Sequence, residues 1–271
     1  MHIQILGTAA AEAWPALFCG CETCRRARAT GGYNFRSRAS IQIDDVYKID
    51  FPPDSYHHLA RWSLDFSRIE HLFFTHSHED HFALRELAYL RPPFAHNLAS
   101  PPVRIYGSST VTSAVEEHFG SLVMPIELVT LSAFEPVAAG ELTFTPIVAR
   151  HKPTEECFNY VVSSDSGAFL YACDTGVYDR PTTDFLRSAR LDLLIVECTQ
   201  GTLDMPATSH MSFEAVLDLR NTLIDSGAVR PDVPVVVTHF SHNMGLLHEE
   251  FQAIAGPEGV RVAYDGMELT C

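Results

Sequence analysis

Leu72-Phe73-Phe74-Thr75-His76-Ser77-His78-Glu79-Asp80-His81-Phe82 is the stretch on which the prediction of the fold depends. It begins with four β-prone residues, places three histidines and an aspartate within the six positions 76–81, and precedes a helical pattern that begins at Leu84. A strand that ends in a turn before a helix is a rigid support for metal ligands. Imidazole and carboxylate groups suit Zn, Fe and Mn. Because the cluster holds more ligands than one four-coordinate ion with an open position accepts, it predicts two metal ions.

The alternative is a polar turn whose histidines are scattered over the surface. From the composition of the chain, three histidines and one aspartate at fixed positions arise by chance with odds of about 0.002. In an extended turn, His76 and His78 project to the same side. Asp80 and His81 follow two and three residues after His78, where they can bind a second ion beside the first. We therefore interpret the stretch as a metal site.

The chain has 271 residues, of which 46% are hydrophobic and 20% are charged, an ordinary balance for a globular protein. No linker, internal repeat or low-complexity tract divides it, so one domain over residues 1–271 is expected. No apolar run reaches the roughly 18 residues of a membrane span. Residues 1–7 lack the features of a signal peptide and are predicted to form a first strand, which favours a cytoplasmic protein.

The formal net charge of −15 disfavours nucleic acid as a partner, because phosphates are repelled unless a local basic patch receives them. One short basic cluster occurs, and it consists of Arg25, Arg26, Arg28, Arg36 and Arg38. A small anionic substrate that is attracted to metal charge fits this charge pattern better than a polymer does.

The chain contains seven cysteines, an odd number. Cys19, Cys21 and Cys24 lie within six positions, a spacing more typical of a metal site than of a disulfide framework. The alternative is three reduced thiols on the surface, an unfavourable arrangement because exposed thiols are reactive. Cys173 and Cys198 flank or end apolar runs and are predicted to be small buried residues.

Strand-like and helical segments alternate along the chain, which predicts an α/β sandwich of two sheets with helices outside. His57 and His58, on one predicted helix, are expected to face solvent. Strands are predicted at 2–6, 41–43, 46–49, 72–75, 103–106, 126–131, 142–148, 158–163, 168–172, 193–196, 235–237 and 260–264. Helices are predicted at 25–29, 54–62, 84–90 and 213–223, with another after Gly107.

Three further polar side chains, His151, Asp174 and His239, each follow a strand-like run. A lone histidine in such a place is more often a hydrogen-bonded core or surface residue than a ligand. We interpret these residues as metal ligands only because they occur together with the cluster at positions 76–81.

The motif His76-x-His78-x-Asp80-His81 resembles the HxHxDH signature of the metallo-β-lactamase superfamily. Together with Cys19-x-Cys21-x-x-Cys24 and Asp265-Gly266-Met267-Glu268, it makes the chain similar to the cyclic phosphodiesterases of the carbon–phosphorus lyase pathway. Their substrate is a phosphoribosyl 1,2-cyclic phosphate. The resemblance runs from Gly7-Thr8 to Met267 and implies an αββα sandwich of two mixed sheets. An alanine-rich loop, residues 9–13, stands where that family has a glycine-rich one.

The resemblance also implies the ligand sets. One ion would bind His76, His78 and His151, the other Asp80, His81 and His239, with Asp174 bridging two ions that are Zn or Mn. Asp50 would accept the free N–H of a ligand histidine. His210 matches a histidine that contacts phosphate or protonates the leaving oxygen, although it also suits the start of a helix. A structural zinc would bind Cys19, Cys21, Cys24 and His242.

The predicted chemistry is hydrolysis of a small cyclic or nucleotide-like phosphodiester by a hydroxide held between two metal ions. One alternative is an RNA-processing endonuclease of the same superfamily, which the net charge and the lack of a basic arm disfavour. Others are a hydrolase of lactones or thioesters and a non-catalytic metal-binding protein. The open metal positions argue against the last of these. The resemblance also suggests a homodimer.

Overall fold

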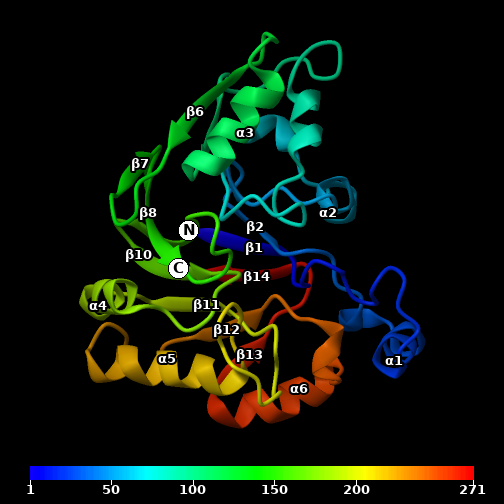
Figure 1. Cartoon of the computed structure of the whole chain (residues 1–271), viewed down its shortest axis with the longest axis vertical. Coiled ribbons are helices and arrows are strands. Elements are labelled where there is room, and N and C mark those ends of the chain that lie inside the picture. Colours follow the sequence, from blue (N-terminus) through cyan, green and yellow to red (C-terminus); the bar gives the residue numbers. More distant parts are fainter.

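The computed structural model describes all 271 residues. Two seven-stranded β-sheets pack face to face, and helices cover their outer faces (Figure 1). The first sheet has the order β14-β1-β2-β3-β4-β5-β6 and the second the order β13-β12-β11-β10-β9-β8-β7. Each sheet contains both parallel and antiparallel pairs. The predicted αββα sandwich of mixed sheets is therefore confirmed.

The strands of the first sheet are β1 (His2–Gly7), β2 (Ser40–Ile43), β3 (Tyr47–Ile49), β4 (His71–Phe73), β5 (Val103–Gly107), β6 (Ile126–Thr130) and β14 (Met267–Thr270). Those of the second are β7 (Val137–Ala139), β8 (Leu142–Ala149), β9 (Cys157–Ser164), β10 (Gly167–Ala172), β11 (Leu193–Glu197), β12 (Val235–Thr238) and β13 (Val260–Val262). The α-helices are α1 (Glu22–Thr30), α2 (Ser55–Trp62), α3 (Ser109–Phe119), α4 (Arg180–Ser188), α5 (Phe213–Asp225) and α6 (His248–Ala255). Short 3₁₀ helices are Gly32–Asn34, Phe66–Arg68, Leu84–Leu90, His242–Met244 and Gly256–Glu258.

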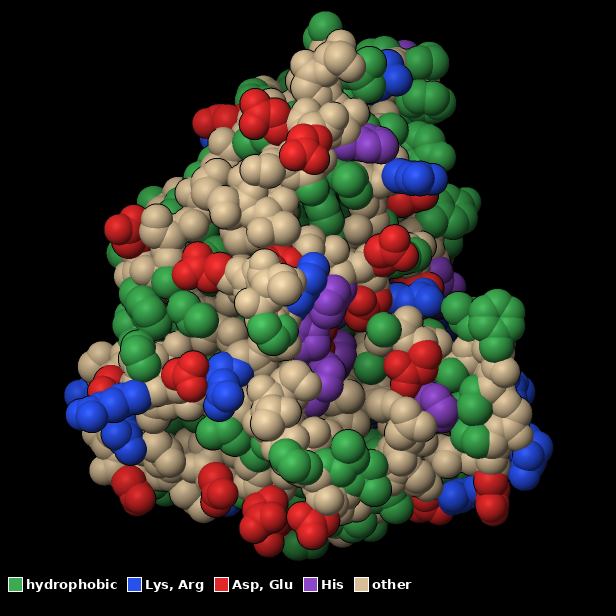
Figure 2. Space-filling view, viewed as in Figure 1, with side chains coloured by type: hydrophobic (Ala, Val, Ile, Leu, Met, Phe, Trp, Pro, Cys, Tyr) green, Lys and Arg blue, Asp and Glu red, His purple; other side chains and the backbone are tan.

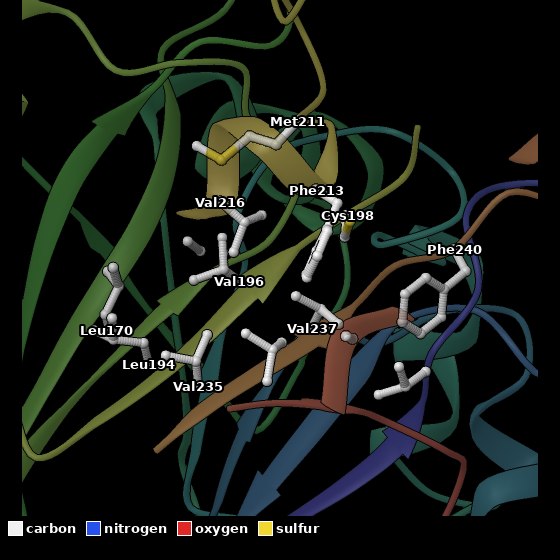
Figure 3. Packing of buried hydrophobic residues seen from close by; sticks show 14 of the residues in the cluster. Leu170, Leu194, Val196, Cys198, Met211, Phe213, Val216, Val235, Val237 and Phe240 are labelled. Carbon is white, nitrogen blue, oxygen red and sulfur yellow. The ribbon is translucent and has the colours of Figure 1, made fainter. Parts of the chain in front are cut away.

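The alternation of side chains along each strand builds separate cores on its two faces. Leu193 and Ile195 of β11 belong to the core between the sheets, where 25 buried residues include Phe73 and Phe144 with ring centroids 3.8 Å apart. Leu194 and Val196, which alternate with them along β11, face a second core beneath α4, α5 and α6 (Figure 3). The uninterrupted apolar run of β11 thus reflects burial on both faces.

Several elements differ from the sequence prediction. The strands β7 and β14 and the helices α4 and α6 were not predicted, and residues 84–90 form a 3₁₀ helix. α1 begins at Glu22, because the Cys21 side chain caps it by accepting the Cys24 N–H. The prediction that both His57 and His58 face solvent is wrong for His58, which is buried with its Nε2 2.8 Å from Ser37 Oγ. No helix is of a length and apolarity that would let it cross a bilayer.

Candidate metal centre

The ends of four strands bring the seven predicted ligands to one edge of the sandwich. The turn after β4 carries His76, His78, Asp80 and His81, while β8, β10 and β12 are followed by His151, Asp174 and His239. Histidine side chains accordingly gather in a strip at the centre of the face seen in Figure 2. His76, His81, Asp174 and His239 are buried, so the protein rather than solvent fixes their orientation.

The first ligand set joins two segments that are distant in the sequence. His78 Nδ1 lies 2.8 Å from His76 Nε2 and 3.0 Å from His151 Nε2. Asp174 Oδ2 lies 3.4 Å from His76 Nε2 and 3.7 Å from His151 Nε2. Ligand atoms around a tetrahedral ion with bonds of about 2.0–2.1 Å are about 3.3 Å apart. The four atoms therefore have the separations that one divalent ion requires.

The second ligand set surrounds the same carboxylate. His239 Nε2 lies 3.1 Å from Asp174 Oδ1, whereas His81 Nε2 lies 2.9 Å from Asp174 Oδ2 and 3.2 Å from Asp80 Oδ2. His81 Nε2, His239 Nε2 and Asp174 Oδ1 are all buried and form no hydrogen bond. Buried polar atoms almost always have a partner. These three buried atoms without hydrogen-bond partners lie close together, so a bound metal ion could serve as their common partner.

The charge distribution favours a cation at this point. Burial lowers the pKa of His81, but the carboxylates of Asp80, Asp50 and Asp174 outweigh burial and raise this pKa well above its usual value. The same carboxylates stabilise any positive charge placed among them. Because imidazole and carboxylate ligands suit divalent metal ions such as Zn or Mn, the residues present fit a metal centre.

Hydrogen bonds behind the ligands determine which ring nitrogen faces the centre. Thr75 Oγ1 donates to Asp50, so it accepts the Nδ1–H of His76 at 3.0 Å and leaves Nε2 as the free ligand atom. Asp50 Oδ2 also accepts the Nδ1–H of His81 at 2.7 Å. The structure thus places Asp50 behind two ligand histidines, where a carboxylate orients the rings and raises their basicity.

Three residues of the centre have left-handed backbone conformations, namely Asp50 (φ 63°), Asp174 (φ 55°) and His239 (φ 57°). Each directly follows or nearly follows a strand, at the point where the chain turns towards the metal site. A non-glycine residue in this region costs about 1–2 kcal/mol. Such strain persists where surrounding contacts over-determine it, which is typical of functional sites.

Comparison with known proteins agrees with this geometry. The profile of the "Beta-lactamase superfamily domain" matches residues 49–240, which include every predicted catalytic ligand. The chain belongs to the metallo-β-lactamase superfamily. No curated protein sequence matches it.

Several solved structures resemble the chain along its whole length. A diphosphatase of the PhnP family has 22% identity and a TM-score of 0.78, covering 100% of this chain and 97% of that one. Zn²⁺-bound PqqB from Methylobacterium extorquens has 17% identity and a TM-score of 0.77, with 100% of both chains covered. The short form of human tRNase Z has 18% identity and a TM-score of 0.64, covering 100% and 99%. At these identities the likeness establishes the fold.

A second cluster lies where the N-terminal loop meets the loop after β12. Its side chains are Cys19, Cys21, Cys24 and His242, and their ligand atoms all lie within 4.8 Å of one another. His242 Nδ1 lies 3.5 Å from Cys21 Sγ and 3.9 Å from Cys19 Sγ. The backbone N–H of Cys24 is the main influence that lowers the pKa of Cys21 to about 6. The structure thus brings the four predicted ligands of a structural zinc together, and the lowered pKa of Cys21 favours the thiolate form that binds metal.

Glu197 is a site residue that the sequence analysis missed. It ends β11, is fully buried, and its Oε1 lies 2.9 Å from His210 Nδ1. Its other oxygen accepts the Thr199 hydroxyl, which in turn accepts the Nδ1–H of His239 at 2.8 Å. The signal in the sequence was an acidic residue at the end of a buried apolar run, the same position that identified Asp174 and His239.

Glu197 also controls the charge of His210. Burial lowers the pKa of His210, but the hydrogen bond and charge of Glu197, together with Asp174, raise this pKa to about 9. His210 Nδ1 also lies 3.4 Å from Asp174 Oδ1. His210 therefore lies beside the proposed metal centre, where neighbouring carboxylates favour its protonated form and Glu197 holds its Nδ1 side.

Proposed function

We propose that this protein hydrolyses small cyclic or nucleotide-like phosphodiesters with the help of two divalent ions, Zn or Mn. Membership of a superfamily of metal-dependent hydrolases supports hydrolysis. The observation that carries the more specific proposal is the position of Asp174. Its Oδ2 lies 3.4 Å from His76 Nε2 of the first ligand set. In the second set, His239 Nε2 lies 3.1 Å from Oδ1 and His81 Nε2 lies 2.9 Å from Oδ2. Both sets therefore surround one carboxylate, which could bridge two ions.

One ion would be held by His76, His78 and His151, and the other by Asp80, His81 and His239. Bound there, divalent ions supply positive charge that acidifies water and neutralises phosphate oxygens. The chain itself contributes the orientation of the ligands. Asp50 and Glu197, each acting partly through a threonine hydroxyl, hold the ring N–H groups away from the centre.

His210 is the proposed general acid. A leaving alkoxide needs a proton, and the Nε2–H of a histidine that is cationic at neutral pH can donate one. Glu197 holds the Nδ1 side of the ring at 2.9 Å and so orients Nε2. The side chain retains 27% exposure, so a substrate can reach it.

The structural zinc is the third part of the proposal. Cys19, Cys21, Cys24 and His242 together form a closed four-ligand set of the kind that holds structural zinc. A zinc there would join the N-terminal loop to the loop that carries His239. Metal analysis of the purified protein tests this part separately from activity.

The alternative function is an RNA-processing endonuclease, which the structural likeness to human tRNase Z brings into consideration. The formal net charge of −15 disfavours it, because an RNA substrate needs a positively charged surface. A small substrate places its one phosphate at the metal centre and needs no such surface.

The test is hydrolysis of bis(p-nitrophenyl) phosphate and a 2′,3′-cyclic nucleotide by metal-replete protein, once with Mn and once with Zn. A lactone and a precursor tRNA serve as the competing substrates, and His76→Ala serves as the inactive control. Phosphodiester turnover that disappears in His76→Ala supports the proposal. Turnover of the lactone alone, or cleavage of the tRNA alone, would replace it with one of the alternatives.

A further inference from the structure

The first ligand set of the metal centre is supplied by two segments that are distant in the sequence. His76 and His78 lie in the turn after β4, whereas His151 lies in the loop between β8 and β9. A metal site needs its ligands held to within about 0.5 Å of the productive geometry. One side chain, that of Glu155, contacts both the turn and the loop.

The carboxylate of Glu155 holds the main chain of the turn. This side chain is fully buried, with 0% exposure. Its Oε1 accepts the backbone N–H of Ser77 at 2.9 Å, and its Oε2 accepts the Ser77 hydroxyl at 2.5 Å. Ser77 is the residue between the ligands His76 and His78. The Ser108 hydroxyl, just before α3, donates to Oε1 at 3.4 Å and adds a further link to the first sheet.

The same carboxylate also holds the loop that carries His151. Lys152 follows His151 directly, and its Nζ donates to Glu155 Oε2 and to Ser77 Oγ, each at 3.0 Å. The backbone N–H of Glu155 donates to the Lys152 carbonyl at 3.1 Å, which closes this part of the loop into a turn. Ser77, Lys152 and Glu155 therefore form a closed set of hydrogen bonds that joins the two segments.

The ring of His78 depends on its main chain more than the rings of the other two ligands do. Thr75 Oγ1 accepts the ring N–H of His76, and the carbonyl of Ser209 lies 3.1 Å from His151 Nδ1 on the side away from the centre. The hydrogen-bond contacts of the His78 ring are instead made by its Nδ1 with the other two ligands. Its orientation is therefore determined by the main chain that the buried carboxylate holds.

Charge gives the carboxylate a second role. A positive charge beside a metal ligand repels a divalent ion, and this repulsion is larger where water is partly excluded. The Nζ of Lys152 is held against Ser77, between two ligands, and the side chain is only 30% exposed. The negative charge of Glu155 lies 3.0 Å away and neutralises it. Removal of this negative charge would loosen the turn and also leave the lysine charge uncompensated.

We propose that Glu155 is a positioning residue for the ion held by His76, His78 and His151. Its carboxylate fixes the turn that carries the first two ligands, and through Lys152 it fastens the loop of the third ligand to that turn. None of its hydrogen bonds reaches the second ligand set, so the ion held there depends on it much less. The inference rests on the proposed metal centre and is independent of the substrate.

The test measures the affinity for Mn²⁺ at one position at a time. Thiolates favour softer ions, so Mn²⁺ reports on the histidine and carboxylate ligands and avoids the cysteine cluster. His239→Ala removes a ligand of the second ion and retains the first ligand set, while His151→Ala does the reverse. Titration followed by the EPR signal of free Mn²⁺ gives the Kd in each background.

Glu155→Gln keeps the size of the side chain, removes its charge and turns an N–H₂ group towards existing donors. In the His239→Ala background it is expected to weaken Mn²⁺ binding about tenfold, and in the His151→Ala background less than about threefold. In the otherwise unmodified protein it should weaken one of two binding steps. Unchanged affinity in the His239→Ala background and in both steps of the unmodified protein would overturn the proposal, as would equal weakening in both backgrounds.

A rescue variant and a matched control separate positioning from a loss of general stability. Adding Lys152→Met to Glu155→Gln removes the uncompensated charge and is expected to recover about threefold in affinity. Absence of any recovery would refute the electrostatic part of the proposal. Glu250→Gln is the control, because Glu250 also accepts a backbone N–H, that of Leu247 at 2.9 Å, and also pairs with a basic side chain, Arg26. It should leave both Mn²⁺ affinities unchanged.

Failure of this inference is distinguishable from failure of the proposed function. An unmodified protein that binds no divalent ion outside the cysteine cluster would refute the metal centre and this inference with it. Two bound ions whose affinities ignore Glu155→Gln would refute the role of Glu155 alone. Two bound ions, the expected response to Glu155→Gln and no phosphodiester turnover would refute the proposed function and support the inference.

Discussion

Lys48 provides a quantitative test of how burial shapes this fold. It lies in β3, and its side chain is completely buried, with Nζ donating to Ser40 Oγ at 2.6 Å. The rings of Phe51 and Phe66 lie 5.9 and 5.2 Å from Nζ. Burial lowers the pKa of Lys48 from 10.5 to about 7, although Asp50 opposes this effect. We expect Lys48→Met, which keeps the length and removes the charge, to change stability in a pH-dependent way.

The direction follows from proton linkage. Between pH 7 and 10.5 the unfolded chain binds a proton at Lys48 that the folded chain does not bind, so the unfolding free energy of the wild type rises with pH across this window. At 1.36 kcal/mol per pH unit, the lowered pKa corresponds to a destabilisation of about 5 kcal/mol below pH 7. The substitution also removes the hydrogen bond and the cation–π contacts, together about 2 kcal/mol. Lys48→Met is therefore expected to be about 2–3 kcal/mol more stable than the wild type at pH 6.

At pH 10 this advantage should disappear. The folded amine is neutral there and keeps only its hydrogen bond, worth about 1 kcal/mol, and a charge penalty of about 1 kcal/mol offsets it, so the two proteins should be about equally stable. Urea denaturation of both proteins at pH 6 and pH 10 measures this. Arg187→Met is the control, because it removes a positive charge from a side chain of α4 that retains 51% exposure. A stability difference that is the same at both pH values would refute the reasoning, as would destabilisation by Lys48→Met at pH 6.

Three further predictions concern the two proposed metal sites. His210→Ala should lower turnover by about 10²- to 10⁴-fold while the metal content stays full; loss of metal together with activity, measured by atomic emission, would contradict its role as an acid. Asp50→Asn should weaken binding of the catalytic ions by about 10- to 100-fold, because it disturbs both Thr75 and the N–H acceptor of His81; equilibrium dialysis against Zn would show unchanged affinity if this is wrong. Cys21→Ser should remove one zinc per chain and lower Tm, and an unchanged zinc content would end the structural-zinc proposal.

The candidate ligands could be recognised in the sequence because each lies just after a strand, and strand ends are recognisable as apolar runs that stop at a polar residue. Asp174 and His239 were predicted on this basis together with a family resemblance. Glu197 has the same signature at the end of β11 and was missed, because only the folded chain shows that it contacts His210. The local sequence pattern identifies where a strand ends, but which side chain lies opposite that end is determined by how distant segments pack together.

Other features depend on contacts between distant parts of the chain. β14 pairs with β1 from the opposite end of the sequence. Its four residues are too few for their alternating pattern to identify a strand without that partner. His58 lies on an amphipathic helix with polar neighbours, and its burial follows from packing against Ser37.

The loop after β12 connects the two proposed metal sites mechanically. His239 has a left-handed backbone, a conformation that needs support from its surroundings. That support comes from Phe240, whose N–H donates to Thr8 and whose carbonyl accepts from Ala10, and from His242 in the cysteine cluster. Loss of the structural zinc would free His242 and relax this loop, so the ion held by Asp80, His81 and His239 should weaken first. The ion held by His76, His78 and His151 shares no segment with this loop, and its affinity should change least.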